Sequence, residues 1–209
     1  MNDMNMIFER RSVRKFKDED VKDKDLTKMI EAAIEAPSAK NLQNWHFVIL
    51  KNRDMIARLE QIVLEKNEEL SQFLNGEQKE KFVKFSKYAT IFKNAPVTVL
   101  VYAGNYNPTG LDLVRKSGDL KTAEIIEKAA PGIHGVAAAI QNFMLAASSL
   151  GYGTCWMTSP NYAIKEIESF IGLEKEGYHL VAITPLGVPE YIGKRPPRKS
   201  IDEVVTIIK

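Results

Sequence analysis

The chain of 209 residues contains a single cysteine, Cys155, and few histidines. One cysteine excludes an intramolecular disulfide and a zinc site built on several thiolates, and it favours a reducing compartment. His46, His134 and His179 lie on separate segments without the HExxH spacing, so no metal site is expected. The phosphate-binding patterns GxGxxG and GxxxxGK[ST] are both absent. A kinase, an ATPase and a Rossmann dinucleotide site are therefore disfavoured.

The net charge is also small, and the apolar runs are short. Lys and Arg number 29 against 27 Asp and Glu, which leaves a formal charge of +2. That balance predicts neither a nucleic acid nor an anionic membrane as partner, and no run approaches the ~18 apolar residues of a membrane span. Residues 1–11 lack the apolar core of a secretory signal, so we expect a cytoplasmic protein.

The composition that is present, 44% hydrophobic and 27% charged, is typical of a globular chain. Length predicts one domain over residues 1–209, with a helical excursion at about 54–93. Hydrophobic periodicity predicts a short amphipathic helix around Met4–Phe8 and further helices at 23–34, 54–70, 77–93, 131–150 and 164–171, with Asp23 as an N-cap. The predicted strands are 45–51, 97–103, 154–158 and 179–188, and residues 105–122 are predicted as a loop or lid.

The predicted helix 131–150 is strongly apolar and carries many small side chains. Its glycine and alanines permit close approach of another helix, which favours burial against a second subunit. The small residues on this face are Gly135, Ala137, Ala138, Ala139, Ala146 and Ala147.

Basic residues gather near both ends of the chain. Arg10-Arg11-Ser12-Val13-Arg14-Lys15-Phe16 supplies bidentate donors, a hydroxyl and turn N–H groups, which suit a phosphate. A solvated basic turn accounts for this stretch equally well, and the tail around Arg198 is as ambiguous by itself. Convergence of the two clusters would require an anion between them, because like charges repel.

Few other residues offer chemistry. The loop from Ala36 to Trp45 is rich in Ser, Asn and Gln that could match a heterocycle edge, although turn chemistry at a helix end is the simpler interpretation. Cys155 is interpreted as core packing rather than a nucleophile. Without an activated nucleophile, a metal or an acid–base pair, the chemistry points to a bound organic cofactor that carries a phosphate.

Three separated motifs resemble one known family, the FMN-dependent nitroreductase and flavin reductase family. They are the Arg10–Phe16 stretch, Ala36-Pro37-Ser38 with Asn41 to Phe47, and Ala137 to Trp156; the tail Pro197 to Val204 also matches. The resemblance implies an α+β fold with a central mixed, mostly antiparallel sheet flanked by helices. It further implies an intertwined homodimer that holds two FMN molecules at the subunit interface.

The resemblance also assigns roles to residues. Arg10, Ser12 and Arg198 would hold the FMN phosphate with help from Arg11, and Lys194 or Arg195 could share that role. Arg14 would lie under the pyrimidine side of the ring, where a cation favours the reduced anion, so it is expected to tune the flavin while no side chain is catalytic. The ribityl and ring-edge contacts, commonly from the partner subunit, would be Pro37, Ser38, Asn41 and Gln43. The stretch near flavin N5 would be Met157, Thr158 and Ser159.

Two positions depart from the common pattern of the family. Asn44 stands where proline usually precedes the tryptophan, and Thr158-Ser159-Pro160 replaces a glycine-rich or Glu-Gly turn near N5.

The activity implied is ping-pong hydride transfer from NADH or NADPH through FMN to a small acceptor, such as a nitroaromatic, a quinone or a flavin. The alternatives are reductive dehalogenation, an oxygen-dependent flavin reaction, and a non-catalytic FMN-binding protein. The excursion 54–93 and the loop 105–122 are the expected acceptor selectors.

Overall fold

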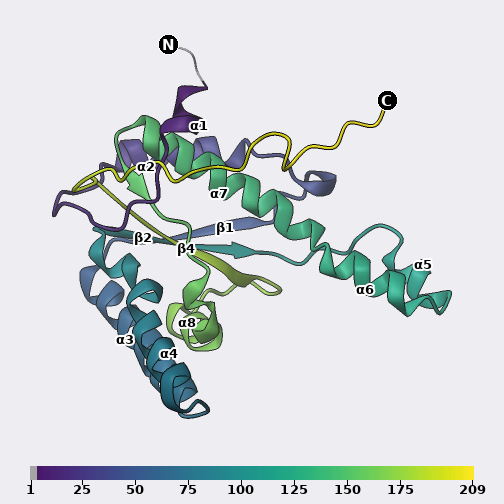
Figure 1. Cartoon of the computed structure of the whole chain (residues 1–209), viewed down its shortest axis with the longest axis horizontal. Coiled ribbons are helices and arrows are strands. Elements are labelled where there is room, and N and C mark those ends of the chain that lie inside the picture. Colours follow the sequence, from purple (N-terminus) through teal and green to yellow (C-terminus); the bar gives the residue numbers. More distant parts are fainter. Residues whose placement is uncertain (1–3) are drawn as a thin grey trace.

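The computed structural model describes residues 4–209, and its centre is a four-stranded sheet (Figure 1). The strands are β1 (Trp45–Leu50), β2 (Val97–Ala103), β3 (Gly153–Thr154) and β4 (His179–Gly187), in the spatial order β1-β2-β4-β3. All paired strands run antiparallel, and one isolated parallel bridge joins Ser12 to Thr154. The predicted antiparallel sheet flanked by helices is confirmed, with its mixed character confined to that bridge.

Helices cover both faces of the sheet. They are α1 (Asn5–Glu9), α2 (Asp23–Ile34), α3 (Arg53–Ser71), α4 (Gly76–Ala89), α5 (Leu111–Lys116), α6 (Leu120–Lys128), α7 (Pro131–Ser149) and α8 (Ile164–Ile171). Short 3₁₀ turns occupy Ala39–Asn41, Ile91–Asn94 and Ser159–Ala163. Helices α2 and α7 lie on one side of the sheet, and α3, α4 and α8 lie on the other (Figure 1).

Strand β2 shows why helices cover both faces of the sheet. All seven of its residues are buried. Val97, Val99 and Val101 belong to the apolar cluster with α2 and α7, whereas Leu100 and Tyr102 belong to the cluster with α3 and α8. Because successive side chains of a strand point to opposite faces, an uninterrupted apolar run requires a core on each side.

Helix α7 begins and ends where the proline and the glycine at its ends predict. It begins at Pro131, and Gly151, beyond its C-cap Leu150, adopts a left-handed φ of 85°. Only His134 and Ser149 of this helix are exposed in the single chain. Gly135 allows the close approach of Ser38 in the loop after α2, since an added Cβ would lie 3.0 Å from the Cβ of Ser38.

The prediction of a loop or lid at 105–122 was wrong for half of its residues, because α5 and the start of α6 occupy 111–116 and 120–122. The Asn, Gly and Pro residues only shape the turns around them: Gly110 and Gly118 have left-handed φ values of 85° and 83°. Asp119 then caps α6 by accepting a hydrogen bond from the Thr122 amide at 3.0 Å. The α5–α6 hairpin extends away from the sheet (Figure 1).

Three element limits also differ from the sequence expectation. Strand β3 ends at Thr154, and Met157 makes only an isolated bridge to Ile183, because the 3₁₀ turn containing Pro160 follows at once. Asp23 is the first helical residue of α2 and lies in its first turn, while Lys22 occupies the N-cap position. The predicted helix 77–93 is divided into α4 and the 3₁₀ turn Ile91–Asn94.

Asn44 connects the end of β2 to the start of α7. Its side chain is 6% exposed, and its Nδ2 donates to the carbonyls of Gly104 at 2.9 Å and Gly132 at 3.2 Å. The Asn44 carbonyl in turn accepts from the Gly104 amide at 2.7 Å. This departure from the family pattern therefore supplies a buried polar link between two elements.

We expect Asn44→Ala to lower the free energy of unfolding by roughly 1–3 kcal/mol, because it removes both side-chain bonds and leaves two carbonyls without this donor. Urea unfolding followed by circular dichroism measures the change. Asn75→Ala is the matched control, since Asn75 is exposed and its side chain makes no capping bond. Equal stability of the two variants would contradict the role of Asn44.

Candidate functional site

Backbone pairing holds the N-terminal basic stretch in place. The Val13 amide donates to the Thr154 carbonyl of β3 at 2.8 Å. Further along, the Lys17 amide donates to Val188 at 2.9 Å, and the Glu190 amide donates to Lys15 at 3.1 Å. Residues 12–17 thus run between β3 and the segment that follows β4. This pairing brings the first and last parts of the chain together.

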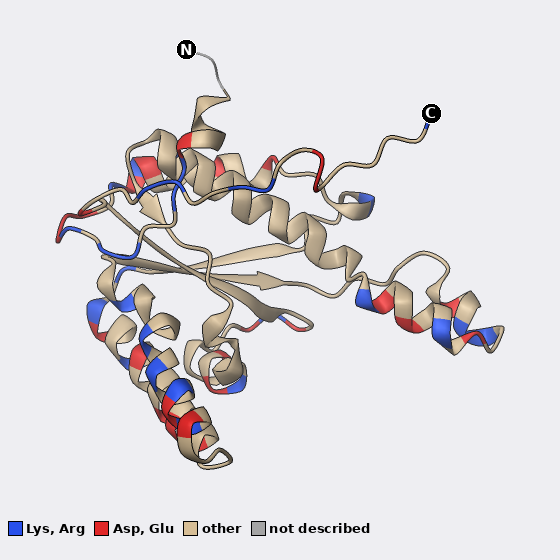
Figure 2. Ribbon diagram, in the orientation of Figure 1, with Lys and Arg blue, Asp and Glu red and all other residues tan. Residues whose placement is uncertain are grey.

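Three guanidinium groups from the two chain ends lie close to one another. Arg10 is partly buried, and its pKa is lowered first by burial and then by the positive charges of Arg11 and Arg198. Figure 2 shows basic residues of the N-terminal stretch and of the tail on the same side of the molecule, beside α7. The structure therefore brings together the two basic clusters that the sequence places almost 190 positions apart.

Two N–H groups of this cluster lack a partner. Nη1 of Arg10 and Nε of Arg11 are buried and make no hydrogen bond to any group of residues 4–209. Nη1 of Arg11 is already engaged, because it donates to the carbonyls of Phe8 at 2.6 Å and Arg10 at 2.9 Å. A buried donor without an acceptor is costly, and a cationic one more so. The cluster is therefore built to receive an anion with several acceptor oxygens.

The tail reaches α1 through a second basic residue. The guanidinium of Arg195 lies over the Phe8 ring, 5.6 Å from its centroid. Nη1 of Arg198 donates only to carbonyls of its own segment, those of Pro196 and Pro197. Arg195 is thus engaged with α1, while Arg198 is the tail residue whose charge acts on Arg10.

A second part of the site is a cavity of about 300 Å³ on the other side of the basic stretch. Arg14 lines it together with the predicted residues Met157, Thr158 and Ser159. The remaining lining residues are Phe85, Tyr88, Ile91, Cys155 and Trp156. The excursion expected to select the acceptor thus reaches this cavity through α4, whereas the segment 105–122 does not line it within one chain.

The sequence reasoning did not name Phe85 and Tyr88. A signal was available, because Phe82, Phe85 and Tyr88 recur every third residue along an otherwise charged helix. Phe82 packs against Tyr162 at a centroid distance of 5.8 Å, so the first ring anchors the helix and the next two extend toward the cavity. Only the folded arrangement distinguishes the anchoring ring from the lining ones.

The polar loop 37–43 forms a strained turn at the other end of α7. Lys40, Asn41 and Gln43 have left-handed φ values of 56°, 51° and 47°, which are uncommon without glycine. The Ser38 hydroxyl accepts from the Gln43 amide at 2.9 Å, and Gln43 Nε2 donates to Asn41 Oδ1 at 3.1 Å. Pro37, Asn41 and Gln43 are exposed, so their polar groups face outward.

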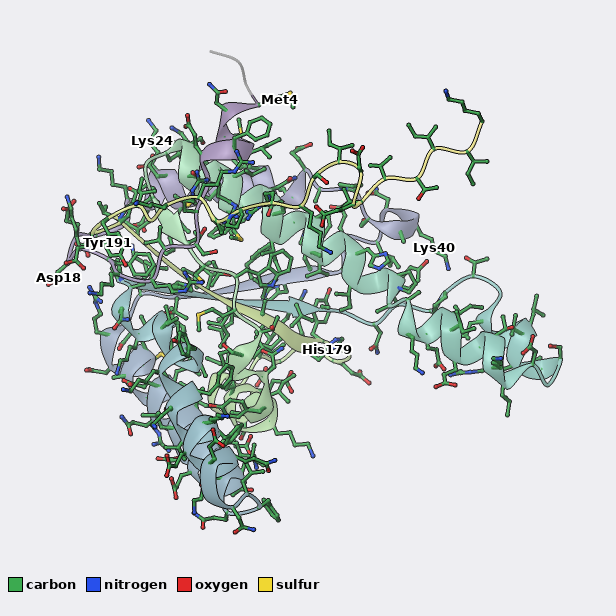
Figure 3. The ribbon with its side chains drawn as sticks, in the orientation of Figure 1. Met4, Asp18, Lys24, Lys40, His179 and Tyr191 are labelled. Carbon is green, nitrogen blue, oxygen red and sulfur yellow. The ribbon has the colours of Figure 1, made fainter. Side chains whose placement is uncertain are left out.

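The two groups of predicted site residues do not meet within one chain. Ser38 lies beside Gly135 near the start of α7, whereas Arg10 and Arg11 share a small cavity with Ser148 near its end. At ~1.5 Å per residue these positions on α7 are about 20 Å apart. In Figure 3, Lys40 of the polar loop and Tyr191 of the tail lie at opposite sides of the view.

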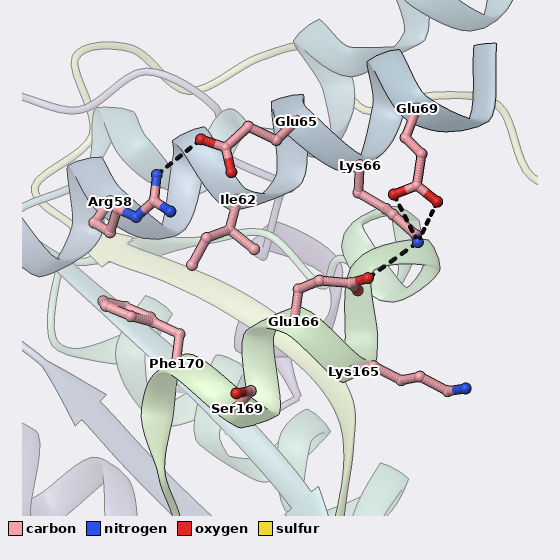
Figure 4. Close-up of a pocket in the computed structure, with 9 residues that line it drawn as sticks. All are labelled: Arg58, Ile62, Glu65, Lys66, Glu69, Lys165, Glu166, Ser169 and Phe170. Carbon is pink, nitrogen blue, oxygen red and sulfur yellow. Dashed lines mark hydrogen bonds and ion pairs between the residues drawn. The ribbon is translucent and has the colours of Figure 1, made fainter. Parts of the chain in front are cut away.

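Another cavity, with a volume of about 500 Å³, lies between α3 and α8 (Figure 4). Five of its six charged lining residues pair with one another. Lys66 binds Glu69 at 2.9 Å and Glu166 at 3.0 Å, and Arg58 binds Glu65 at 2.8 Å. Paired surface charges of this kind offer a ligand little, in contrast to the unpartnered donors of the arginine cluster.

Cys155 lies behind the basic stretch, between the two parts of the site. It is 5% exposed, and burial raises the pKa of its thiol, although Arg14, the Ser12 hydroxyl and Arg10 act in the opposite direction. Between residues 4 and 209, no three metal-ligating side chains of the His, Cys, Asp or Glu type come together. Over the same residues, every helix is too short or too polar to span a bilayer.

Comparison with known proteins gives a consistent assignment. A family model described as the nitroreductase family matches residues 7–188. A crystal structure of a BluB-like flavoprotein from Clostridium difficile 630 is similar over 100% of both chains, with a TM-score of 0.94 and 42% identity. A protein of Archaeoglobus fulgidus named "Putative NADH dehydrogenase/NAD(P)H nitroreductase" is 25% identical over 189 residues, which are 90% of this chain and 85% of that protein.

A third likeness shows the fold alone. The structure of an oxidized iodotyrosine deiodinase bound to FMN and 3-iodo-L-tyrosine has a TM-score of 0.71 and 22% identity, over 99% of both chains.

The raised pKa of Cys155 predicts a thiol that stays protonated at pH 7.5 and reacts slowly. We expect iodoacetamide to alkylate it at least about tenfold more slowly in the folded protein than in guanidinium chloride, as mass spectrometry can measure. The pKa of the thiol is higher in the folded chain than in the unfolded chain. The contribution of the buried, protonated thiol to the free energy of unfolding is therefore complete below about pH 8.5, and it is lost as the pH rises through the folded pKa. Equally fast alkylation in both states would show a reactive cysteine instead.

Proposed function

The chain belongs to the nitroreductase family, a family of oxidoreductases, and from that premise we propose that it is an FMN-dependent enzyme. In this proposal NADH or NADPH supplies two electrons, and a small acceptor such as a nitroaromatic, a quinone or a flavin receives them. The observation that carries the proposal is the pair of buried guanidinium N–H groups without partners, on Arg10 and Arg11.

The arginine cluster fits the phosphate of FMN. A phosphate monoester carries close to two negative charges and several acceptor oxygens, which matches Arg10, Arg11 and Arg198 together with the Ser12 hydroxyl. Each charge-assisted hydrogen bond contributes about 1.5–3 kcal/mol. The anion also relieves the repulsion that lowers the pKa of Arg10.

The cavity beyond the cluster fits the ring of the same cofactor. Arg14 would place a fixed positive charge beside it, while Met157, Thr158 and Ser159 would contribute the contacts near N5. A preorganised cation stabilises negative charge that develops during reduction, without any proton transfer by the protein. Arg14 is therefore proposed as the electrostatic tuner of the site.

A second subunit would complete the site. Pro37, Ser38, Asn41 and Gln43 lie about 20 Å from the arginine cluster of their own chain, measured along α7. In a twofold assembly the loop of one subunit would meet the cluster of the other. Large apolar side chains at both chain ends are exposed in the single chain and would be covered in such an assembly, among them Ile7, Phe8, Ile201, Val204 and Ile208.

When bound, FMN supplies the hydride chemistry, by accepting electrons from the nicotinamide and passing them to the acceptor. The side chains then need only hold the cofactor, tune it and orient donor and acceptor in turn. The name of the Archaeoglobus relative supports the nicotinamide donor, and the flavoprotein from Clostridium difficile supports the flavin.

We expect the purified protein to contain about one FMN per chain, and Arg10→Ala to weaken FMN binding about 10- to 100-fold by removing a charge-assisted contact. Flavin absorbance and equilibrium dialysis measure both quantities. Arg58→Ala is the matched control, because Arg58 is paired with Glu65 in the groove between α3 and α8. FMN that is bound equally well by all three proteins would remove the cluster from the proposal.

Gln43→Ala extends this experiment to the second subunit. Weaker FMN binding in this variant as well supports a site shared between two chains, because Gln43 is distant from Arg10 within one chain. Unchanged FMN binding would restrict the site to residues of a single chain.

Steady-state turnover tests the activity itself. We expect the FMN-loaded protein to oxidise NADH or NADPH in the presence of a nitrofuran or menadione, with parallel lines in double-reciprocal plots as ping-pong transfer requires. The rate is followed at 340 nm, with 2-iodophenol and air as separate acceptors. Halide release alone would favour reductive dehalogenation, and oxygen consumption alone would favour an oxygen-dependent flavin reaction. If neither nucleotide were oxidised, the result would favour a non-catalytic FMN-binding protein.

A further inference from the structure

One wall of the 300 Å³ cavity is aromatic and exposed. Phe85 and Tyr88 on α4 are 40% and 62% exposed, with ring centroids 6.3 Å apart and planes tilted by 37°. Trp156 contributes a third ring and is 38% exposed. Rings of this size normally bury most of their surface, so the wall leaves apolar faces available to a flat molecule.

The wall is separate from the arginine cluster proposed to hold the FMN phosphate, although it shares the cavity with the residues proposed near the flavin ring. Helix α4 packs mainly on α3 and on the 3₁₀ turns Ile91–Asn94 and Ser159–Ala163. The arginine cluster is instead formed by the two chain ends. Changes in Phe85 or Tyr88 therefore leave the phosphate cluster intact.

The charge of the cavity has one sign. Arg14 is the only charged residue that lines it, and none of its described lining residues is Asp or Glu. An ammonium group in this cavity would meet a cation and find no carboxylate, whereas a neutral or anionic ring would not be opposed. The 3-iodo-L-tyrosine bound by the deiodinase carries such an ammonium group.

Resting on the proposed function, we propose that Phe85 and Tyr88 are specificity-determining residues for the acceptor. They stack on planar aromatic acceptors that are neutral or anionic. Because no carboxylate lines the cavity beside Arg14, its positive charge repels the ammonium group of aromatic amino acids and excludes them. Selection thus combines an attractive element, the two rings, with a repulsive one, the unopposed cation.

Two probes that differ in one group test the repulsive element. They are 3-(4-nitrophenyl)propanoate and 4-nitro-L-phenylalanine, of which only the second has an ammonium group. Equilibrium dialysis against the FMN-loaded protein measures the dissociation constant of each, and steady-state kinetics measures each acceptor KM. We expect the propanoate to bind at least about tenfold more tightly than the amino acid.

Variants of the wall test the attractive element. We expect Tyr88→Ala and Phe85→Ala, compared with the unaltered protein at equal FMN occupancy, each to raise the dissociation constant and KM of the propanoate about fivefold. Phe73→Ala is the matched control, because Phe73 is 80% exposed at the tip of the same hairpin and lies outside the cavity. This variant should bind the propanoate as the unaltered protein does.

Two outcomes overturn the proposal: equal affinity for the two probes, or wall variants that bind the propanoate as Phe73→Ala does. Failure of the proposed function has a different signature, namely absence of FMN or of nucleotide oxidation. Dialysis does not require turnover, so it measures the selectivity of the FMN-loaded cavity even when neither nucleotide is oxidised.

Discussion

The pairing of residues 12–17 between β3 and the segment after β4 is the constraint on which the candidate site depends. Three backbone hydrogen bonds hold this stretch, from Val13 to Thr154, from Lys17 to Val188 and from Glu190 to Lys15. Backbone bonds do not depend on charge, so they can hold Arg10 and Arg198 near each other despite their repulsion. The fold thereby maintains a concentration of positive charge that the chain, with a net charge of only +2, does not show as a whole.

Helix α7 sets the second constraint, which is distance. The polar loop with Ser38 packs near its start and the arginine cluster lies near its end, because Gly135 admits the loop and Ser148 borders the cluster. A straight helix of 19 residues keeps these groups apart in every copy of the chain. In the proposed two-chain assembly the loop of one subunit would meet the cluster of the other, and the apolar side chains exposed at both chain ends would be covered.

Some elements could be predicted from local sequence and others could not. Pro131 and Gly151 mark the limits of α7, and the apolar run 97–103 identifies a buried strand, since both signals act within a few residues. The hairpin α5–α6 was missed because the Asn, Gly and Pro residues of 105–118 favoured a loop, although these residues only shape the turns around short helices. Composition averaged over a window conceals elements shorter than the window.

The sequence by itself determined the kinds of groups at the site, namely guanidiniums near both ends and a polar loop after α2. Tertiary structure alone decided which of them meet. It placed Arg198 beside Arg10, left two of the cluster's N–H groups without a partner, and turned Phe85 and Tyr88 toward Arg14. The physical reason is range: propensity and periodicity act over one or two turns, whereas pairing, burial and repulsion act between residues that only the folded chain brings together.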